Sequence, residues 1–121
     1  MKILVIDDSR GMRLLVQRML HSAGYAEESI FFAVDGEDGY QKYKEHQPDL
    51  ILSDWLMPVK SGLELLLQLR KEDSAVKFGF ITSQGTEKKE EHAMEAGADF
   101  FLSKPFGADN LLAKINAIMA Q

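Results

Sequence analysis

Cysteine is absent from the 121-residue sequence. Its absence excludes disulfide bridges, thiolate zinc sites and cysteine nucleophiles, and it suits a reducing compartment. Long hydrophobic runs are absent as well, because the apolar runs reach only a few residues and a bilayer requires roughly 20. Since Met1-Lys2 leads directly into such a short run rather than into a cleavable signal, we expect a soluble cytoplasmic protein that does not bind membranes.

Positive charge is also scarce. Lysine and arginine number 14 against 19 aspartate and glutamate residues, which gives a net charge of -5, and the basic residues are scattered. Proteins that bind nucleic acid cluster these residues against the phosphates, so we expect no direct nucleic-acid partner. No linker rich in proline, glycine or serine, no low-complexity tract and no repeat interrupts the sequence, so we predict a single domain over residues 1–121.

Five short apolar runs recur along the sequence. Their continuity, rather than an alternation with polar residues, is typical of strands that are buried on both faces of a parallel sheet. The runs cover residues 3–6, 30–34, 50–52, 78–81 and 100–102. Amphipathic stretches separate them, and this order predicts a doubly wound α/β domain with helices on both faces of the sheet.

The amphipathic stretches between the runs are predicted helices of unequal strength. Two of them place apolar residues on one helical face: Met12, Leu15, Val16, Met19 and Leu20, and later Leu111, Leu112, Ile115, Ile118 and Met119. Gly24 is the expected stop of the first helix. A third helix should follow Ser61-Gly62 and bury Leu63, Leu66 and Leu67. Residues 40–46 and 86–96 are more weakly apolar.

Polar residues follow the runs where the predicted strands end. They are Asp7-Asp8, Ser53-Asp54, Thr82-Ser83 and Ser103-Lys104-Pro105. In open α/β sheets, ligands bind beyond the carboxyl ends of the strands. Three carboxylates gathered there would raise one another's pKa values unless a cation compensated their charge. Mg²⁺ is the natural candidate, because it prefers oxygen ligands and binds one or two carboxylates together with a phosphate oxygen.

Asp54 would lie at the centre of this edge of the sheet. A carboxylate can act as a nucleophile toward a phosphoryl group and form an acyl phosphate. Phosphoryl transfer depends mainly on positioning and on charge stabilisation, which Lys104, Mg²⁺ and the Thr82 hydroxyl can supply to the phosphoryl oxygens. The sequence therefore predicts a phosphoryl-acceptor site.

This set of residues resembles the receiver domain of bacterial two-component response regulators over essentially all 121 residues. The matching residues are Asp7-Asp8, Asp54 in the segment DWLMP, Thr82-Ser83 and Lys104-Pro105-Phe106. Asp8-Ser9-Arg10, Met12-Arg13, Trp55 and the expected absence of an output domain are similar to stand-alone receivers of the chemotaxis type. The resemblance implies a flavodoxin-like (βα)5 fold with strand order 2-1-3-4-5 and a cis Lys104–Pro105 peptide bond.

The resemblance also implies a role for each residue of the site. Asp54 would be the phosphoryl acceptor, and Lys104 would contact the phosphoryl group. The ligands of Mg²⁺ would be Asp7, Asp8, Asp54 and the backbone carbonyl of Leu56. A sensor histidine kinase would supply the phosphoryl group, in a pathway that we expect to be chemotaxis or related signalling. The protein would then be a phosphoacceptor that catalyses only its own phosphotransfer and dephosphorylation.

The implied conformational switch consists of Thr82 and Phe101. Phosphorylation would change the face formed by the helix near 86–96, the strand at 100–102 and the helix at 111–119, which binds a target protein. Phe101 stands where many chemotaxis receivers carry tyrosine. Leu56 and Gln84 would tune hydrolysis of the phosphoryl group, and since only glutamine can orient a water, we expect an intermediate phosphoryl lifetime. We expect a monomer before phosphorylation.

Several alternative interpretations remain open. A phosphorylation-independent binding module would typically lack one of the acidic or lysine positions, all of which are present. An aspartyl-phosphate hydrolase would need a second aspartate where Leu56 stands, and the acidic loop after the first strand would repel the phosphate of a flavin carrier. At the level of single residues, Asp7-Asp8 could merely cap a helix, and Trp55 could be either a structural ring or a partner contact. Surface positions are expected for His21, His46 and His92.

Overall fold

The computed structural model describes residues 1–120, in which strands and helices alternate. The strands are β1 (Ile3–Ile6), β2 (Ile30–Ala33), β3 (Leu50–Ser53), β4 (Lys77–Thr82) and β5 (Phe100–Ser103). The helices are α1 (Arg10–Ser22), α2 (Gly36–His46), α3 (Gly62–Lys71), α4 (Glu87–Glu95) and α5 (Ala108–Met119). A short 3-10 helix, η1 (Glu27–Ser29), precedes β2. Among these helices none is both long and apolar enough to cross a membrane.

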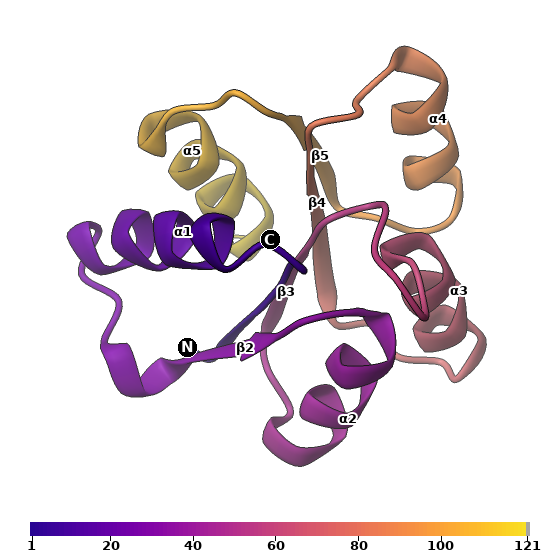
Figure 1. Cartoon of the computed structure of the whole chain (residues 1–121), viewed down its shortest axis with the longest axis horizontal. Helices are drawn as coiled ribbons and strands as arrows, with labels where there is room; N and C mark the ends of the chain where they lie inside the picture. The colour runs from indigo at the N-terminus through magenta and orange to yellow at the C-terminus, as the bar shows by residue number, and fades with distance from the viewer. Residues whose placement is uncertain (121) are drawn as a thin grey trace.

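The strands form one parallel sheet in the order β2-β1-β3-β4-β5. Figure 1 shows α1 and α5 on one face of the sheet and α2, α3 and α4 on the other. This arrangement confirms the predicted doubly wound fold and its strand order. Because all strands run in the same direction, their carboxyl ends meet at one edge of the sheet.

Apolar side chains fill a layer on each side of the sheet. Leu4 and Ile6 of β1 point toward the α2–α3–α4 layer, together with the fully buried Phe78 and Phe80 of β4. The other residues of β1, together with Val16 of α1 and the buried residues of α5, form the second layer. Strands β1 and β3 and most of β4 are buried on both faces, which explains why their sequences are continuous apolar runs.

Local signals place the ends of the helices. The Ser9 hydroxyl caps α1, and Gly24 follows this helix at a φ of +98°, where a residue without a Cβ is favoured. At the start of α3, the Ser61 hydroxyl accepts from the Glu64 N–H, and the Glu64 carboxylate accepts from the Ser61 N–H. The expected end of the first helix and the expected start of the third are therefore confirmed.

Two details differ from the sequence analysis. Leu67 was expected on the buried face of α3, but its side chain is 48% exposed, and the buried leucines are Leu65, Leu66 and Leu69. The error arises because four of the five residues 63–67 are leucine, so the sequence does not show which of them lie on the buried face of the helix. Val34 was expected within the second strand, but its N–H donates to the Asp38 carboxylate of α2 and β2 ends at Ala33.

Candidate functional site

The carboxyl ends of four strands bring the predicted site residues together. Asp7 follows β1, Asp54 follows β3, Thr82 ends β4 and Lys104 follows β5. The registers are aligned at this edge, because Ile6 pairs with Ser53 and Thr82 pairs with Ser103. Strand β2, at one edge of the sheet, supplies no residue to this group.

Lys104 lies between two carboxylates. Its Nζ is 3.2 Å from Asp7 Oδ2 and 3.5 Å from Asp54 Oδ2, and all three side chains are largely buried. The Lys104 N–H donates to the Thr82 carbonyl, and the Lys104–Pro105 peptide bond is cis, as the resemblance implied. The ammonium group therefore lies where it can contact a group bound to Asp54.

Asp7 is the most buried acidic residue of the site, with 3% of its surface exposed. Burial raises the pKa of its carboxyl above the ordinary value of 3.8, and the charge of Asp54 acts in the same direction. The hydrogen bond from the Ser9 N–H and the charge of Lys104 lower the pKa without offsetting the burial. The Asp7 carboxylate is therefore held in surroundings that disfavour its charge.

Asp7, Asp8 and Asp54 form a group of oxygen donors that fits a divalent cation. Each offers one carboxylate oxygen, and these oxygens lie within 4.8 Å of one another. Asp8 is exposed, whereas Asp7 is buried, so the group opens to solvent on one side. A donor set made only of carboxylate oxygens with an open side suits Mg²⁺, which retains several of its waters.

The loop after β3 fixes Asp54. One carboxylate oxygen, Oδ1, accepts from the Trp55 N–H at 2.7 Å, which leaves Oδ2 facing Lys104. The Gly62 N–H donates to the Trp55 carbonyl, and a Cβ at Gly62 would lie 2.1 Å from the Asp54 carbonyl oxygen. Glycine is therefore required here, because the first turn of α3 packs directly on the acceptor's backbone.

The two proposed switch residues are both buried. Thr82 is 0% exposed, and its hydroxyl accepts from the N–H of Gln84, whose side chain is exposed. Phe101 is 7% exposed, and its ring centroid lies 6.1 Å from that of Trp55. Trp55 also packs on Phe80 at 4.8 Å between centroids, so a chain of aromatic rings leads from the residue beside Asp54 to β5.

The remaining predicted residues do not contact the carboxylates of the site within residues 1–120. Leu56 is on the exposed loop two residues after Asp54, with a 59% exposed side chain. Of the three histidines, His21 and His92 are exposed as expected, but the ring of His92 meets that of Trp55 at 6.0 Å. His46 is only partly exposed, since its ring stacks on Phe31.

Sequence reasoning missed the contribution of Arg13. This residue is in the first turns of α1, and its guanidinium donates to the backbone carbonyl of Asp7 at 2.7 Å. The contact supports the turn that carries Asp7 and Asp8. Its sequence signal was the interval of five residues from Asp8 to Arg13, which brings the side chain back beneath that turn once residues 10–22 are helical.

Comparison with known proteins identifies, over most of the chain, the same family that the sequence resembled. The model of the response regulator receiver domain matches residues 3–116. The chemotaxis protein CheY of Bacillus subtilis is 34% identical over 115 residues, which are 95% of this chain and 94% of the relative. The CheY protein of Halobacterium salinarum is 32% identical over 121 residues, covering 98% of this chain and 96% of the relative.

A solved structure agrees closely with the fold. The crystal structure of the CheX–CheY–BeF3–Mg²⁺ complex from Borrelia burgdorferi matches with a TM-score of 0.92 at 25% sequence identity. The match covers 99% of this chain and 90% of that chain. The similarity therefore extends over the whole sheet and its helices.

Proposed function

Because the chain belongs to the response regulator receiver domain family, we propose that it is a phosphorylation-controlled switch of the chemotaxis type whose phosphoryl acceptor is Asp54. Receiver domains are signalling proteins rather than classical enzymes. The observation that carries the proposal is the position of Asp54 Oδ2, which faces Lys104 and lies beside Asp7 and Asp8. The donor would be a phosphohistidine of a sensor kinase.

The chain's own residues can perform the transfer. An oxygen of Asp54 forms the new bond to phosphorus while the phosphorus–nitrogen bond of the donor breaks, and its electron pair stays on the imidazole nitrogen. Lys104 contacts the phosphoryl oxygens, and Asp7 and Asp8, with Asp54 and the Leu56 carbonyl, would hold Mg²⁺. When bound, Mg²⁺ would supply positive charge to the phosphoryl oxygens and compensate the carboxylates.

The switch would act through Thr82 and Phe101. The buried Thr82 hydroxyl can turn from the Gln84 N–H toward a phosphoryl oxygen on Asp54, and the ring of Phe101 on the adjacent strand β5 would move in response. Such a contact biases the equilibrium between two arrangements of the face formed by α4, β5 and α5. A target protein that prefers one arrangement would read the phosphorylation state.

The side chains two residues after Asp54 and after Thr82 would set the lifetime of the phosphoryl group. Leu56 is apolar and offers no group that orients a water or donates a proton, which argues against a dedicated hydrolase. Gln84 is exposed next to the site and can orient a water. Substitution of Gln84 by alanine should therefore slow the loss of the phosphoryl group, measured as the decay of the phosphorylated mass.

The acceptor role can be tested with purified protein, Mg²⁺ and acetyl phosphate, followed by intact mass. We expect one phosphoryl adduct on the wild type and none on Asp54→Asn or after addition of EDTA. Asp109→Asn is the matched control, because it makes the same change at an exposed position in the first turn of α5. An adduct that survives Asp54→Asn would contradict the proposal. So would the absence of any adduct, with both acetyl phosphate and a kinase phosphodonor, in protein that binds Mg²⁺, and a phosphorylation-independent binding module would then be favoured.

A further inference from the structure

The helix α1 carries an unusual concentration of positive charge. Three of the chain's four arginines, Arg10, Arg13 and Arg18, lie on it, and it contains no acidic residue, although the chain has a net charge of -5. The basic residues are scattered along the whole sequence, but α1 gathers these three arginines on one element. Within residues 1–120, the ion pairs of the structure involve none of these three arginines.

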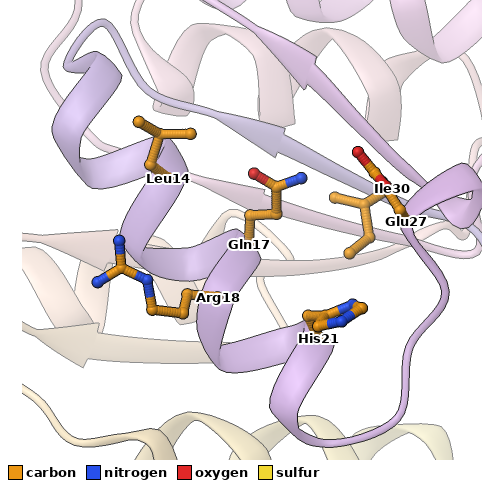
Figure 2. Close-up of a pocket in the computed structure, with 6 residues that line it drawn as sticks. All are labelled: Leu14, Gln17, Arg18, His21, Glu27 and Ile30. Carbon is orange, nitrogen blue, oxygen red and sulfur yellow. The ribbon is translucent and has the colours of Figure 1, made fainter.

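The same helix borders an open groove. Within residues 1–120, α1 and α5 cover this face of the sheet, whereas α2, α3 and α4 cover the opposite face (Figure 1). A hollow of about 320 Å³ lies between α1 and the start of β2, lined by Leu14, Gln17, Arg18, His21, Glu27 and Ile30. In Figure 2, Gln17 projects from the helix toward Ile30 and Glu27.

A second hollow continues the first toward the amino end of α1. It has a volume of about 240 Å³, and its lining consists of Arg10, Arg13, Leu14 and Phe32. Leu14 belongs to both hollows and is 44% exposed. Together the two hollows form the α1–β2 groove, which follows a helix of 13 residues, or about 20 Å at 1.5 Å per residue.

The groove combines an apolar strip with positive charge on its α1 side. Leu14, Phe32 and Ile30 form the apolar strip, and the three arginines stand against a single lining carboxylate, Glu27, at the far end. Arginine binds carboxylates through a planar fork of N–H donors. An apolar strip beside an arginine-bearing helix about 20 Å long matches a partner helix that presents apolar residues at i, i+3, i+4 and i+7.

We propose that the α1–β2 groove binds an acidic amphipathic helix of a partner protein. The apolar stripe of that helix would cover Leu14 and Phe32, and its carboxylates would face Arg10, Arg13 and Arg18. Near Glu27 the partner should lack acidic residues. The proposal does not rest on the phosphoryl-acceptor role, because Asp54, Thr82 and Lys104 do not line the groove; Arg13, which lines it, also donates to the Asp7 carbonyl.

The test uses a synthetic helix of roughly 18 residues, which spans about 27 Å, with a leucine stripe flanked by glutamates. A twin peptide carries lysine in place of each glutamate. Fluorescence anisotropy should detect binding of the acidic peptide and not of its twin. Amide shifts in NMR spectra should concentrate on α1 and β2. Arg18→Glu should weaken binding roughly fivefold to tenfold, and Leu14→Glu should abolish it.

Matched controls separate this groove from other surfaces. Lys88→Glu makes the same change of charge at an exposed position on α4 and should leave binding unchanged. Circular dichroism and thermal unfolding would verify that each variant is folded. Binding that is insensitive to Arg18→Glu and Leu14→Glu, shifts confined to α4 and α5, or no binding at all would each overturn the proposal.

Other occupants give distinct results that would also overturn the proposal. If phosphatidylglycerol vesicles or duplex DNA bind with the same dependence on Arg18 while the acidic peptide does not, the groove recognises phosphate rather than a helix. If sedimentation velocity detects self-association that Arg18→Glu abolishes, the occupant is a second copy. The acidic outer side of α4, with Glu87, Glu90, Glu91 and Glu95, would then be its contact surface.

Discussion

Asp7 lies in surroundings that disfavour its own charge. It is almost fully buried, lies beside a second carboxylate and has only one ammonium group in contact. An isolated carboxylate in such a position reduces the free energy of unfolding. A cation bound by Asp7, Asp8 and Asp54 would remove this penalty, so binding and stability should be coupled at this one side chain.

Replacement of Asp7 by asparagine should stabilise the metal-free protein. The pKa of Asp7 is raised in the folded state, so the stability contributed by this group falls as the pH rises from 3.8 through the raised folded pKa. The gain of Asp7→Asn should therefore be small at acidic pH and reach roughly 1 kcal/mol at neutral pH. Urea unfolding in EDTA at several pH values measures it. A gain that is independent of pH would contradict the assigned cause.

The first turn of α3 is the element that supports the acceptor's backbone. Its start is fixed by the reciprocal hydrogen bonds between Ser61 and Glu64, and Gly62 contacts the Asp54 carbonyl. The N–H group of Ser61 lowers the pKa of the Glu64 carboxyl. The stability that the hydrogen bond from the Ser61 N–H to the Glu64 carboxylate contributes is therefore present at neutral pH. It is lost as the pH falls through the lowered pKa of Glu64.

Ser61→Ala should lower the free energy of unfolding by about 1 kcal/mol, because the Glu64 N–H loses its partner. In a domain of this size that corresponds to a fall in Tm of about 4 °C. Thermal unfolding at neutral pH measures the change. Ser61→Thr, which retains the hydroxyl, is the control and should restore most of the stability. Equal losses in both variants would show that the side-chain cap is not the cause.

The order of the elements was predictable because the central strands β1 and β3 and most of β4 are buried on both faces. A continuous apolar run is then the only sequence that fits, and the parallel direction brings Asp7, Asp54, Thr82 and Lys104 to one edge. The sequence does not identify the buried face of a helix when apolar residues occur on several of its faces. The leucine-rich α3 is one such case, since Leu67 could be assigned to the core only by ignoring Leu65 and Leu69.

Contacts between distant segments could not be predicted from the sequence. The interval from Asp8 to Arg13 became informative only once the helix began at Arg10, and the packing of Gly62 on Asp54 depends on how α3 meets β3. The ring of His92 meets Trp55 because α4 packs over that side of the sheet. Each of these contacts requires the relative placement of two elements, which periodicity alone does not supply.

At the scale of the whole molecule, a ligand at the acidic edge should stabilise the folded chain globally. Four of the five strands end in residues of the site, and a cation that binds only the folded chain shifts the unfolding equilibrium by mass action. At a Mg²⁺ concentration a hundredfold above Kd, the free energy of unfolding should rise by about 2.7 kcal/mol.

Urea unfolding with and without MgCl2, at matched ionic strength in NaCl, measures this effect. Asp7→Asn should reduce the response to Mg²⁺ while it stabilises the metal-free protein, so the two changes have opposite signs. If Mg²⁺ stabilises Asp7→Asn as much as the wild type, the cation binds elsewhere.

The edge strand β2 supplies no residue to the acidic edge of the sheet. Two of its side chains, Ile30 and Phe32, line the α1–β2 groove instead. Chemistry and this recognition surface therefore occupy separate strands of one sheet. Changes at the exposed Leu14 or Arg18 of the groove could alter the partner without altering the acceptor. In an engineered protein, this groove would be the place to redirect specificity.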